Sequence, residues 1–301
     1  MFTMMNNARL SVGLQGVAIA EASYQHAVAY AKERVQGASF KDKKSKVVIA
    51  EHADVKRMLL SMKAQIEAMR ALTYEAALML DLANQGDVEA QARVDLLTPI
   101  VKAGGTDMSL DVTSTGVQVH GGMGFVEETG AAQFYRDARI LPIYEGTNGI
   151  QAADLMFRKL IRDEGGAVKV YLSAAGEVLR DLDAIGDTDI LPMRHALDQA
   201  INAVSEATSW VGVQAKNQAF DQIAGSSVPY QRAFTLLAGG VMMARSMIVA
   251  KKLMNEGHSD KKFLEEKINT AIFYADHLMS MAVGHVHAVT KGVDTILAYE
   301  A

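Results

Sequence analysis

The sequence predicts an all-α protein, built as a four-helix bundle followed by a second helical domain. Only four of the 301 residues are proline, whereas alanine, leucine and methionine, which favour helices, are abundant. Long segments repeat apolar residues every three or four positions, and none shows the convincing alternation of a half-buried strand. These observations together predict helices along most of the chain, packed in two units.

The first helical segment is expected over about 4–36, where small residues recur at spacings of three, four and seven. A stripe of small side chains lets the backbone of another helix approach closely. Gly37 fits a C-cap, and Gly37–Ser45 is expected to be a polar, lysine-rich loop. The small residues of the stripe are Ala8, Gly13, Gly16, Ala20, Ala27 and Ala31.

A second helix is expected over about 51–83, where apolar residues keep a three-four spacing for seven turns, as is typical of a bundle helix. The chain then turns at Asn84–Asp87. The remaining signals of this unit are a helix start at Thr98-Pro99, a break at Gly104-Gly105, a cap at Thr106 with a helix end at His120, a glycine loop over Gly121–Gly124, and a last helix from about Thr147 to Arg162.

A domain boundary is expected at Asp163–Gly166, which divides the chain into units 1–163 and 167–301. The second unit is expected to hold about four helices and shows little chemistry of its own. Its aromatic and methionine residues are typical of core and interface positions. The expected helices cover about 167–184, 193–217, 228–256 and 260–288.

Composition excludes several classes of function. The net charge of −5 does not favour nucleic acid as a partner, and the absence of cysteine rules out disulfides and thiolate sites. No signal peptide and no apolar run of about 20 residues for a membrane span are found, so a cytoplasmic protein is expected. No histidine follows a glutamate by three positions, which argues against a di-iron bundle, and no metal site is predicted.

Three clusters carry candidate chemistry. Three glycines after a helix end, in Gln118–Gly124, expose backbone amides to a phosphate, although the glycines by themselves favour a C-cap with a tight turn. A helix precedes this loop, so it is not a Rossmann loop, which follows a strand. In Ile143–Gln151 an acid at the mouth of a helix is either a general base or a surface acid stabilised by the helix dipole. Arg9 and Arg34 bind phosphates or are merely solvated.

Three runs of sequence, in their order and separation, resemble the C-terminal domain of acyl-CoA dehydrogenases. They are YAKERVQG, QVHGGMGF and YRDARILPIYEGTNGIQ. The resemblance covers residues 1–162, and the tail is similar to the extra helical domain of larger bacterial members. It implies FAD as cofactor, an acyl-CoA as substrate, electron-transfer flavoprotein as electron acceptor, and a dimer or tetramer of identical chains.

The resemblance also implies a role for each matching position. Glu145 matches the base that removes the α-proton of the acyl thioester in a dry pocket, and Gly146 lines the thioester path. The product is a trans-2-enoyl-CoA, after a β-hydride passes to the flavin. Asn6 stands where the family often has an acid. Thr147 and Asn148 match positions that contact the flavin within one subunit, and Asn6 and Arg9 match positions that contact acyl-CoA. The positions that match contacts with the flavin across a dimer interface are Arg34, Gln118, Gly121 and Gly122. His52 is either another flavin contact or structural.

Complete members of the family place a helical domain and a β domain before this region, and the β domain holds much of the flavin. The resemblance therefore implies that the chain is a truncated product or a fragment that carries the catalytic-base half of the enzyme. The alternative is a non-catalytic helical fragment or subunit that acts through oligomerisation.

Overall fold

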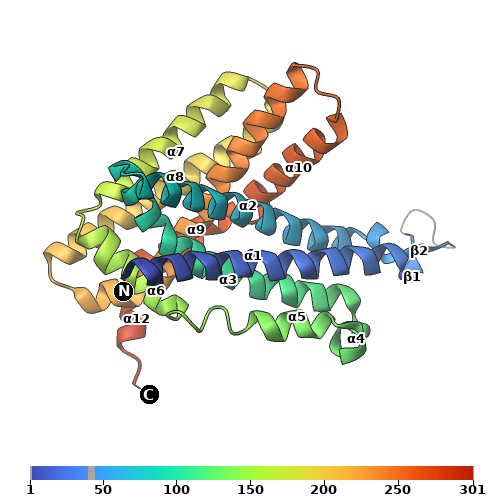
Figure 1. The fold of residues 1–301 in the computed structure, drawn as a ribbon, viewed down its shortest axis with the longest axis horizontal. Coiled ribbons are helices and arrows are strands. Elements are labelled where there is room, and N and C mark those ends of the chain that lie inside the picture. The colour runs from blue at the N-terminus through green and yellow to red at the C-terminus, as the bar shows by residue number, and fades with distance from the viewer. Residues whose placement is uncertain (1, 40–44, 301) are drawn as a thin grey trace.

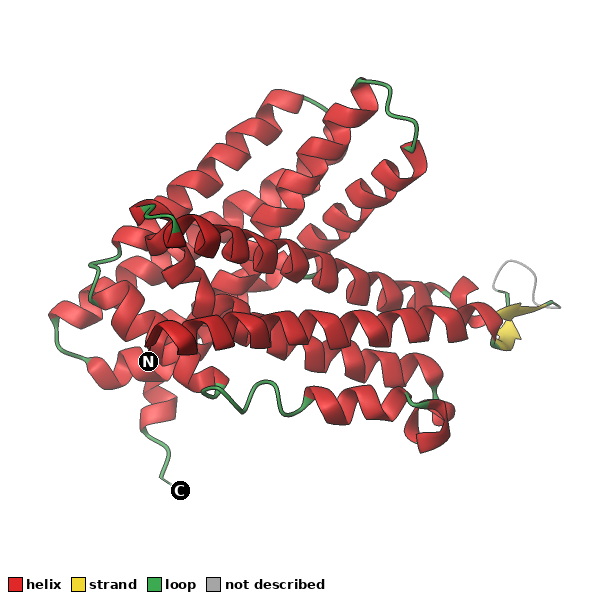
Figure 2. Cartoon of the chain, viewed as in Figure 1, coloured by secondary structure: helices red, strands yellow, loops and turns green. Residues whose placement is uncertain are grey.

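The computed structural model describes residues 2–39 and 45–300, and it confirms the all-α prediction (Figure 1, Figure 2). Seven helices of the first half are α1 (Phe2–Glu33), α2 (Ala53–Asn84), α3 (Val88–His120), α4 (Gly122–Phe125), α5 (Ala131–Ala138), α6 (Asn148–Asp154) and the π-helical turn η3 (Leu155–Ile161). The second half holds α7 (Gly166–Ile185), α8 (Leu191–Lys216), α9 (Phe220–Asn255), α10 (Lys261–His277), α11 (Ala282–Lys291) and α12 (Val293–Leu297). Short 3-10 turns stand at η1 (Ile49–Glu51), η2 (Glu127–Thr129), η4 (Thr188–Ile190) and η5 (Met279–Met281).

Helices α1, α2, α3 and α5 lie side by side as the predicted four-helix bundle (Figure 1). The crossing of α1 and α3 depends on glycine. A Cβ on Gly16 would lie 2.4 Å from the carbonyl oxygen of Gly105, and one on Gly13 would lie 2.6 Å from Cγ1 of Val101. The small-residue stripe therefore serves close packing of two backbones, as predicted.

The predicted break at Gly104-Gly105 is wrong, because α3 runs without interruption from Val88 to His120. The glycines provide room for neighbours instead of ending the helix. Added Cβ atoms would lie 2.5 Å from Thr235 Cγ2 for Gly104 and 2.8 Å from the Gly13 oxygen for Gly105. Burial of this helix against α1 and α9 outweighs the low helix propensity of two adjacent glycines, which amounts to about 2 kcal/mol.

The predicted helix start at Thr98-Pro99 is also wrong. Both residues lie inside α3, whose N-cap is Asp87, with the carboxylate accepting from the Ala90 N–H at 3.0 Å. The Thr98 hydroxyl donates to the Val94 carbonyl at 2.7 Å, as a buried threonine inside a helix commonly does. The predicted cap at Thr106 likewise donates back, to the Lys102 carbonyl at 2.8 Å.

A small β-hairpin stands where a loop was predicted. Strand β1 (Val35–Ala38) pairs antiparallel with β2 (Lys46–Val48), with Val35 opposite Val48 and Ala38 opposite Lys46. Consequently α1 ends at Glu33 instead of continuing to 36. The part of the predicted loop over 40–44 lies outside the described residues. The two strands are only four and three residues long, too short for any alternation to be read from the sequence.

The chain differs from prediction at three further boundaries, two of them in the second half. Helix α9 begins at Phe220, ahead of the predicted start near 228, and carries Pro229 inside it because this segment is buried. The predicted helix over 260–288 is divided by η5 into α10 and α11. The predicted glycine loop after His120 contains the short helix α4, and α5 follows it.

The buried core is one continuous cluster that extends from Leu10 in α1 to Val289 in α11. Polar contacts also join the two halves. Glu75 of α2 accepts from Arg93 of α3 at 2.7 Å and pairs with Arg245 of α9 at 3.6 Å, while the Arg93 guanidinium lies 4.0 Å from the ring centre of Tyr171 in α7. The division into units 1–163 and 167–301 stays a prediction.

Helix α9 is long and apolar enough to cross a membrane when judged by length and composition alone. Its most apolar window has a mean hydropathy of 1.6, and 67% of that window is buried inside the fold. The helix contacts α2, α3, α7, α8, α10 and α11, so its apolar residues form the centre of the second half.

Candidate functional site

The predicted site residues gather at the two ends of the first bundle. Arg9 lies near the start of α1, close to the loop that leads into α6, and Arg34 follows the last turn of α1, at the end where β1 and α4 lie (Figure 1). Arg34 lies 25 positions after Arg9, which corresponds to about 37 Å along a helix. The structure therefore separates the predicted substrate end from the predicted adenosine end.

The loop that carries Glu145 is a series of tight turns between α5 and α6. The Ile143 N–H donates to the Ile140 carbonyl at 2.9 Å, and the Asn148 N–H donates to the Pro142 carbonyl at 3.0 Å. The Tyr144 hydroxyl donates to the side-chain oxygen of Gln15 on α1. These contacts fix both sides of Glu145 against the bundle.

Glu145 has a left-handed backbone, with φ of 54°, and Gly146 follows with φ of 85°. The left-handed region costs a residue with a Cβ about 1 kcal/mol or more, and such conformations cluster at functional sites. In the described part of the chain, the backbone N–H groups of Glu145 and Gly146 have no acceptor. The loop therefore presents a carboxylate beside two free amide donors.

The Glu145 side chain is exposed in this chain. The dry pocket expected around it is not formed by the described residues, because the loop lies on the surface of the bundle. A carboxylate in contact with water keeps its hydration shell. The described residues therefore leave this carboxylate uncovered on the bundle surface.

Thr147 and Asn148 both serve the start of α6. The Thr147 hydroxyl caps the helix by accepting from the Ile150 N–H at 3.4 Å, as the capping motif predicts. The Asn148 side chain faces inward and bonds to α3. Its amide nitrogen donates to Asp107 Oδ1 at 2.6 Å and to Thr106 Oγ1 at 2.9 Å. Asn148 therefore anchors the loop, and its side chain is already saturated by protein partners.

Lys102 lies completely buried beneath this loop, with its ammonium group 2.9 Å from Asn148 Oδ1. Burial lowers the pKa of Lys102 to about 8 and Arg9 lowers it as well, while the negative charges of Asp107 and Glu145 oppose the shift. Lys102 therefore places a buried cationic group at the floor of the site, between Arg9 and the negative charges of Asp107 and Glu145.

Arg9 and Gly146 meet on the other side of the loop. A Cβ on Gly146 would lie 2.8 Å from Nε2 of Gln151 and 3.8 Å from an Arg9 guanidinium nitrogen. Both polar atoms of the Gln151 side chain, and Nε of Arg9, are buried without a hydrogen-bond partner, although Arg9 lies 3.9 Å from the carboxylate of Asp154. Asn6 lies one turn before Arg9 on α1 and is half-buried. These buried polar groups are unsatisfied next to the predicted thioester path.

The opposite end of the bundle brings the other predicted residues together. The Tyr30 ring of α1 stacks on His120 of α3 at 4.4 Å, which places the last turn of α1 beside the glycine loop. Arg34 and Gln118 are exposed there. Added Cβ atoms on Gly121 and Gly122 would meet nothing within 4 Å, so both glycines face open space, as a contact with a rigid ligand requires.

His52 has a structural contact. Its Nε2 lies 2.8 Å from the Gln36 carbonyl oxygen and 3.1 Å from the Cβ position of Gly37, so the ring braces the β-hairpin next to Arg34. This contact explains the residue without a ligand.

Sequence reasoning missed Lys102 and Asp107 of α3 and Gln151 of α6, which lie beside the loop, and Arg232 of α9, which pairs with Asp107. One signal could have found Lys102, because it interrupts the apolar run Leu96–Ala103, and a charge inside such a run indicates a paired, buried group. Gln151 is the last residue of the run YRDARILPIYEGTNGIQ, which carries the resemblance, but the spacing of apolar residues around it does not show that it is buried.

Comparison with known proteins identifies the family of the chain. A family model described as acyl-CoA dehydrogenase, C-terminal domain, matches residues 1–160, which is more than half of the chain. The chain belongs to the acyl-CoA dehydrogenase family. A second model, described as acetyl-CoA dehydrogenase C-terminal like, matches residues 171–300. The resemblance seen in the sequence is thus confirmed for both halves.

The 3-methylmercaptopropionyl-CoA dehydrogenase of Ruegeria pomeroyi is 40% identical over 302 residues, which cover 99% of this chain and 51% of that protein. Two solved structures share the fold. An acyl-CoA dehydrogenase complexed with FAD from Bacillus anthracis has a TM-score of 0.72 at 21% identity, over 100% of this chain and 50% of that one. ACDH-11 of Caenorhabditis elegans, in complex with C11-CoA, has a TM-score of 0.73 at 18% identity. The match covers 95% of this chain and 46% of that one. The chain spans about half the length of the relatives it matches.

Proposed function

We propose that this chain provides the catalytic-base half of an FAD-dependent acyl-CoA dehydrogenase, in which Glu145 removes the α-proton of an acyl-CoA thioester. The observation that carries the proposal is the loop of Glu145 and Gly146, where a carboxylate in a left-handed conformation adjoins two N–H groups without acceptors. Family membership supports the assignment of substrate class and reaction.

The free amides have a specific task in this reaction. Removal of an α-proton places negative charge on the thioester oxygen, and hydrogen-bond donors aimed at that oxygen stabilise the enolate-like transition state. The N–H of Glu145 is such a donor, located on the same residue as the base. Gly146 leaves room for the thioester, and the buried Lys102 holds the Asn148 side chain of the same loop.

The residues of this chain fit part of an FAD site. The open space at Gly121 and Gly122, with exposed Arg34 and Gln118 beside them, suits a pyrophosphate and adenosine end. Thr147 is exposed at the mouth of α6 and suits a contact near the flavin ring system. The Asn148 side chain faces inward and supports the loop, so only the backbone of Asn148 is left for a flavin contact. When bound, FAD accepts the β-hydride. The Thr147 end and the Arg34 end of the bundle are about 37 Å apart along α1. One FAD molecule would therefore contact the Thr147 end of one chain and the Arg34 end of a second copy.

This arrangement supports a homo-oligomer, and we propose electron-transfer flavoprotein as the electron acceptor and the cytoplasm as the location. The exposed position of Glu145 supports the further proposal that the active site is completed by polypeptide beyond these 301 residues. A chain without that cover is expected to bind FAD poorly and to act, if at all, through oligomerisation.

The test is Glu145→Gln in a full-length version that contains this chain. Acyl-CoA-dependent reduction of FAD is expected to fall by about 10²- to 10⁴-fold, the range that general acid–base catalysis contributes. FAD content should stay unchanged because the shape is kept. The control is Glu164→Gln, because Glu164 is also an exposed glutamate with a left-handed backbone before a glycine. Equal turnover by both variants would reject Glu145 as the base.

A further inference from the structure

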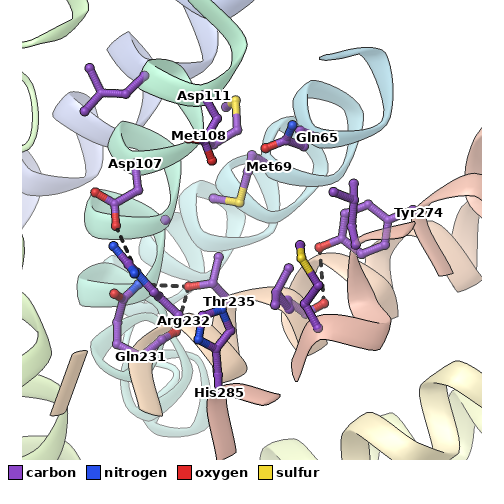
Figure 3. A pocket seen from close by; sticks show the side chains of 15 residues that line it. Gln65, Met69, Asp107, Met108, Asp111, Gln231, Arg232, Thr235, Tyr274 and His285 are labelled. Carbon is purple, nitrogen blue, oxygen red and sulfur yellow. Dashed lines mark hydrogen bonds and ion pairs between the residues drawn. The ribbon is translucent and has the colours of Figure 1, made fainter. Parts of the chain in front are cut away.

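Three residues connect the second half of the chain to the Glu145 loop. Arg232 of α9 places its Nε 3.8 Å from one carboxylate oxygen of Asp107 on α3. The other oxygen of Asp107 accepts from the Asn148 side chain at 2.6 Å. Figure 3 shows Asp107 and Arg232 facing each other across the junction of α3 and α9. Asn148 is three residues after Glu145. The positive charge of Arg232 on α9 therefore reaches the loop through the carboxylate of Asp107, which binds both Arg232 and Asn148.

Asp107 and Arg232 are half-buried and exposed, respectively, and both line a cavity of about 340 Å³ between the two halves (Figure 3). Apolar side chains such as Met69, Met108 and Leu278 form much of the remaining wall. Asp107 is thus partly shielded from water, whereas Arg232 reaches solvent, so the pair is expected to contribute as much as an exposed ion pair does.

We propose that Arg232 is a positioning residue for the Glu145 loop, which it holds through Asp107 and Asn148. The role assigned to the loop rests on the proposed function, whereas the coupling itself rests on the contacts alone. It gives the second half of the chain a part in arranging the loop of Glu145, in addition to the packing of α9 against α6 and α3.

Charge is the means of this coupling. Burial raises the pKa of Asp107, and the hydrogen bond from Asn148 and the positive charge of Arg232 oppose that rise. Loss of Arg232 therefore raises the pKa of Asp107 further and weakens its hold on Asn148 at mildly acidic pH. The charged and titratable groups around Asp107 are Lys102 and Asp111 on α3, Arg139 after α5, Arg232 on α9, and His285 on α11.

The test is amide hydrogen exchange of residues 139–149 in the 301-residue chain, with Arg232→Met, Arg232→Lys and Arg245→Met. Arg232→Met is expected to speed exchange at the Asn148 amide by about two- to fivefold, the range that a single ion pair supports. Arg232→Lys should restore most of the protection. Arg245→Met is the matched control, because Arg245 is also on α9 and pairs with Glu75 instead of Asp107.

Two further readouts separate positioning from a general loss of stability. Exchange in the loop should rise as pH falls, with a midpoint at higher pH in Arg232→Met than in the wild type, once intrinsic rates are corrected. In an Asn148→Ala background, Arg232→Met should have no further effect on the loop. Unchanged loop exchange in Arg232→Met, or an equal change in Arg245→Met, would overturn the proposal. Since none of these measurements needs substrate or FAD, they stand apart from the test of Glu145.

Discussion

The ammonium group of Lys102 lies 2.9 Å from the side-chain oxygen of Asn148, inside the first bundle and directly below the loop of Glu145. Lys102 is completely buried, whereas lysine is almost never so unless paired. The contact shows that the loop rests on a buried cation, and it links the charge of the site to the stability of the fold.

Lys102→Met is expected to change how stability depends on pH. The pKa of Lys102 is about 8 in the fold and about 10.4 in an unfolded chain, so protonation opposes folding. That penalty is complete below pH 8 and disappears as pH rises towards 10.5. The free energy of unfolding of the wild type, relative to Lys102→Met, should therefore rise across this window by up to roughly 3 kcal/mol.

Urea unfolding of both proteins between pH 6 and 10.5 measures this difference. Lys159→Met, which removes a partly exposed lysine paired with Asp95, is the matched control for loss of a lysine. A constant difference between wild type and Lys102→Met over the whole range would contradict the assignment of a depressed pKa.

Gly146→Ala is expected to destabilise the protein by about 1–2 kcal/mol, because φ of 85° is unfavourable for alanine. The added Cβ would also lie 2.8 Å from Gln151 Nε2. Gly149→Ala, only three residues on, should be neutral or stabilise by up to about 1 kcal/mol, since Gly149 is helical with nothing within 4 Å of its Cβ position. Thermal unfolding compares the two. The reverse order of stabilities would show that the loop geometry is misassigned.

Gly16→Ala tests the crossing of α1 and α3. The new Cβ would meet the Gly105 carbonyl oxygen at 2.4 Å, and since this is backbone, the helices must separate. Overpacking of this kind costs about 1–3 kcal/mol. Gly176→Ala in α7 has open space around it and should stabilise by about 0.5–1 kcal/mol. Chemical denaturation of both variants decides this, and equal stabilities would show that α1 and α3 are not in such close contact.

The fold could be predicted from the sequence where one signal dominates. The spacing of apolar residues predicted α2, and the stripe of small residues in α1 predicted that another helix approaches it closely. Prediction failed where local propensity and burial disagree. Gly104-Gly105 and Thr98-Pro99 are breakers by propensity, but α3 is buried along this stretch and remains helical. The hairpin at Val35–Val48 is too short to be recognised by alternation.

The site was only partly predictable. The resemblance marked Glu145, Gly146 and Thr147, and the geometry of the loop agrees with a functional role for the first two. It did not reveal Lys102 or Arg232, because their importance depends on contacts with Asn148 and Asp107 across different helices. Nor did it show that Glu145 is exposed in this chain, since exposure depends on which other parts of the fold cover the loop.

The most direct test of the central claim is proton exchange at the α-carbon of bound substrate. In a full-length version containing this chain, incubation with acyl-CoA in D₂O should incorporate deuterium at the α-position, because a base removes that proton reversibly. Glu145→Gln should abolish this incorporation while FAD remains bound, and Glu164→Gln should not affect it. Undiminished α-deuteration by Glu145→Gln would contradict the account, because another group would then be the base.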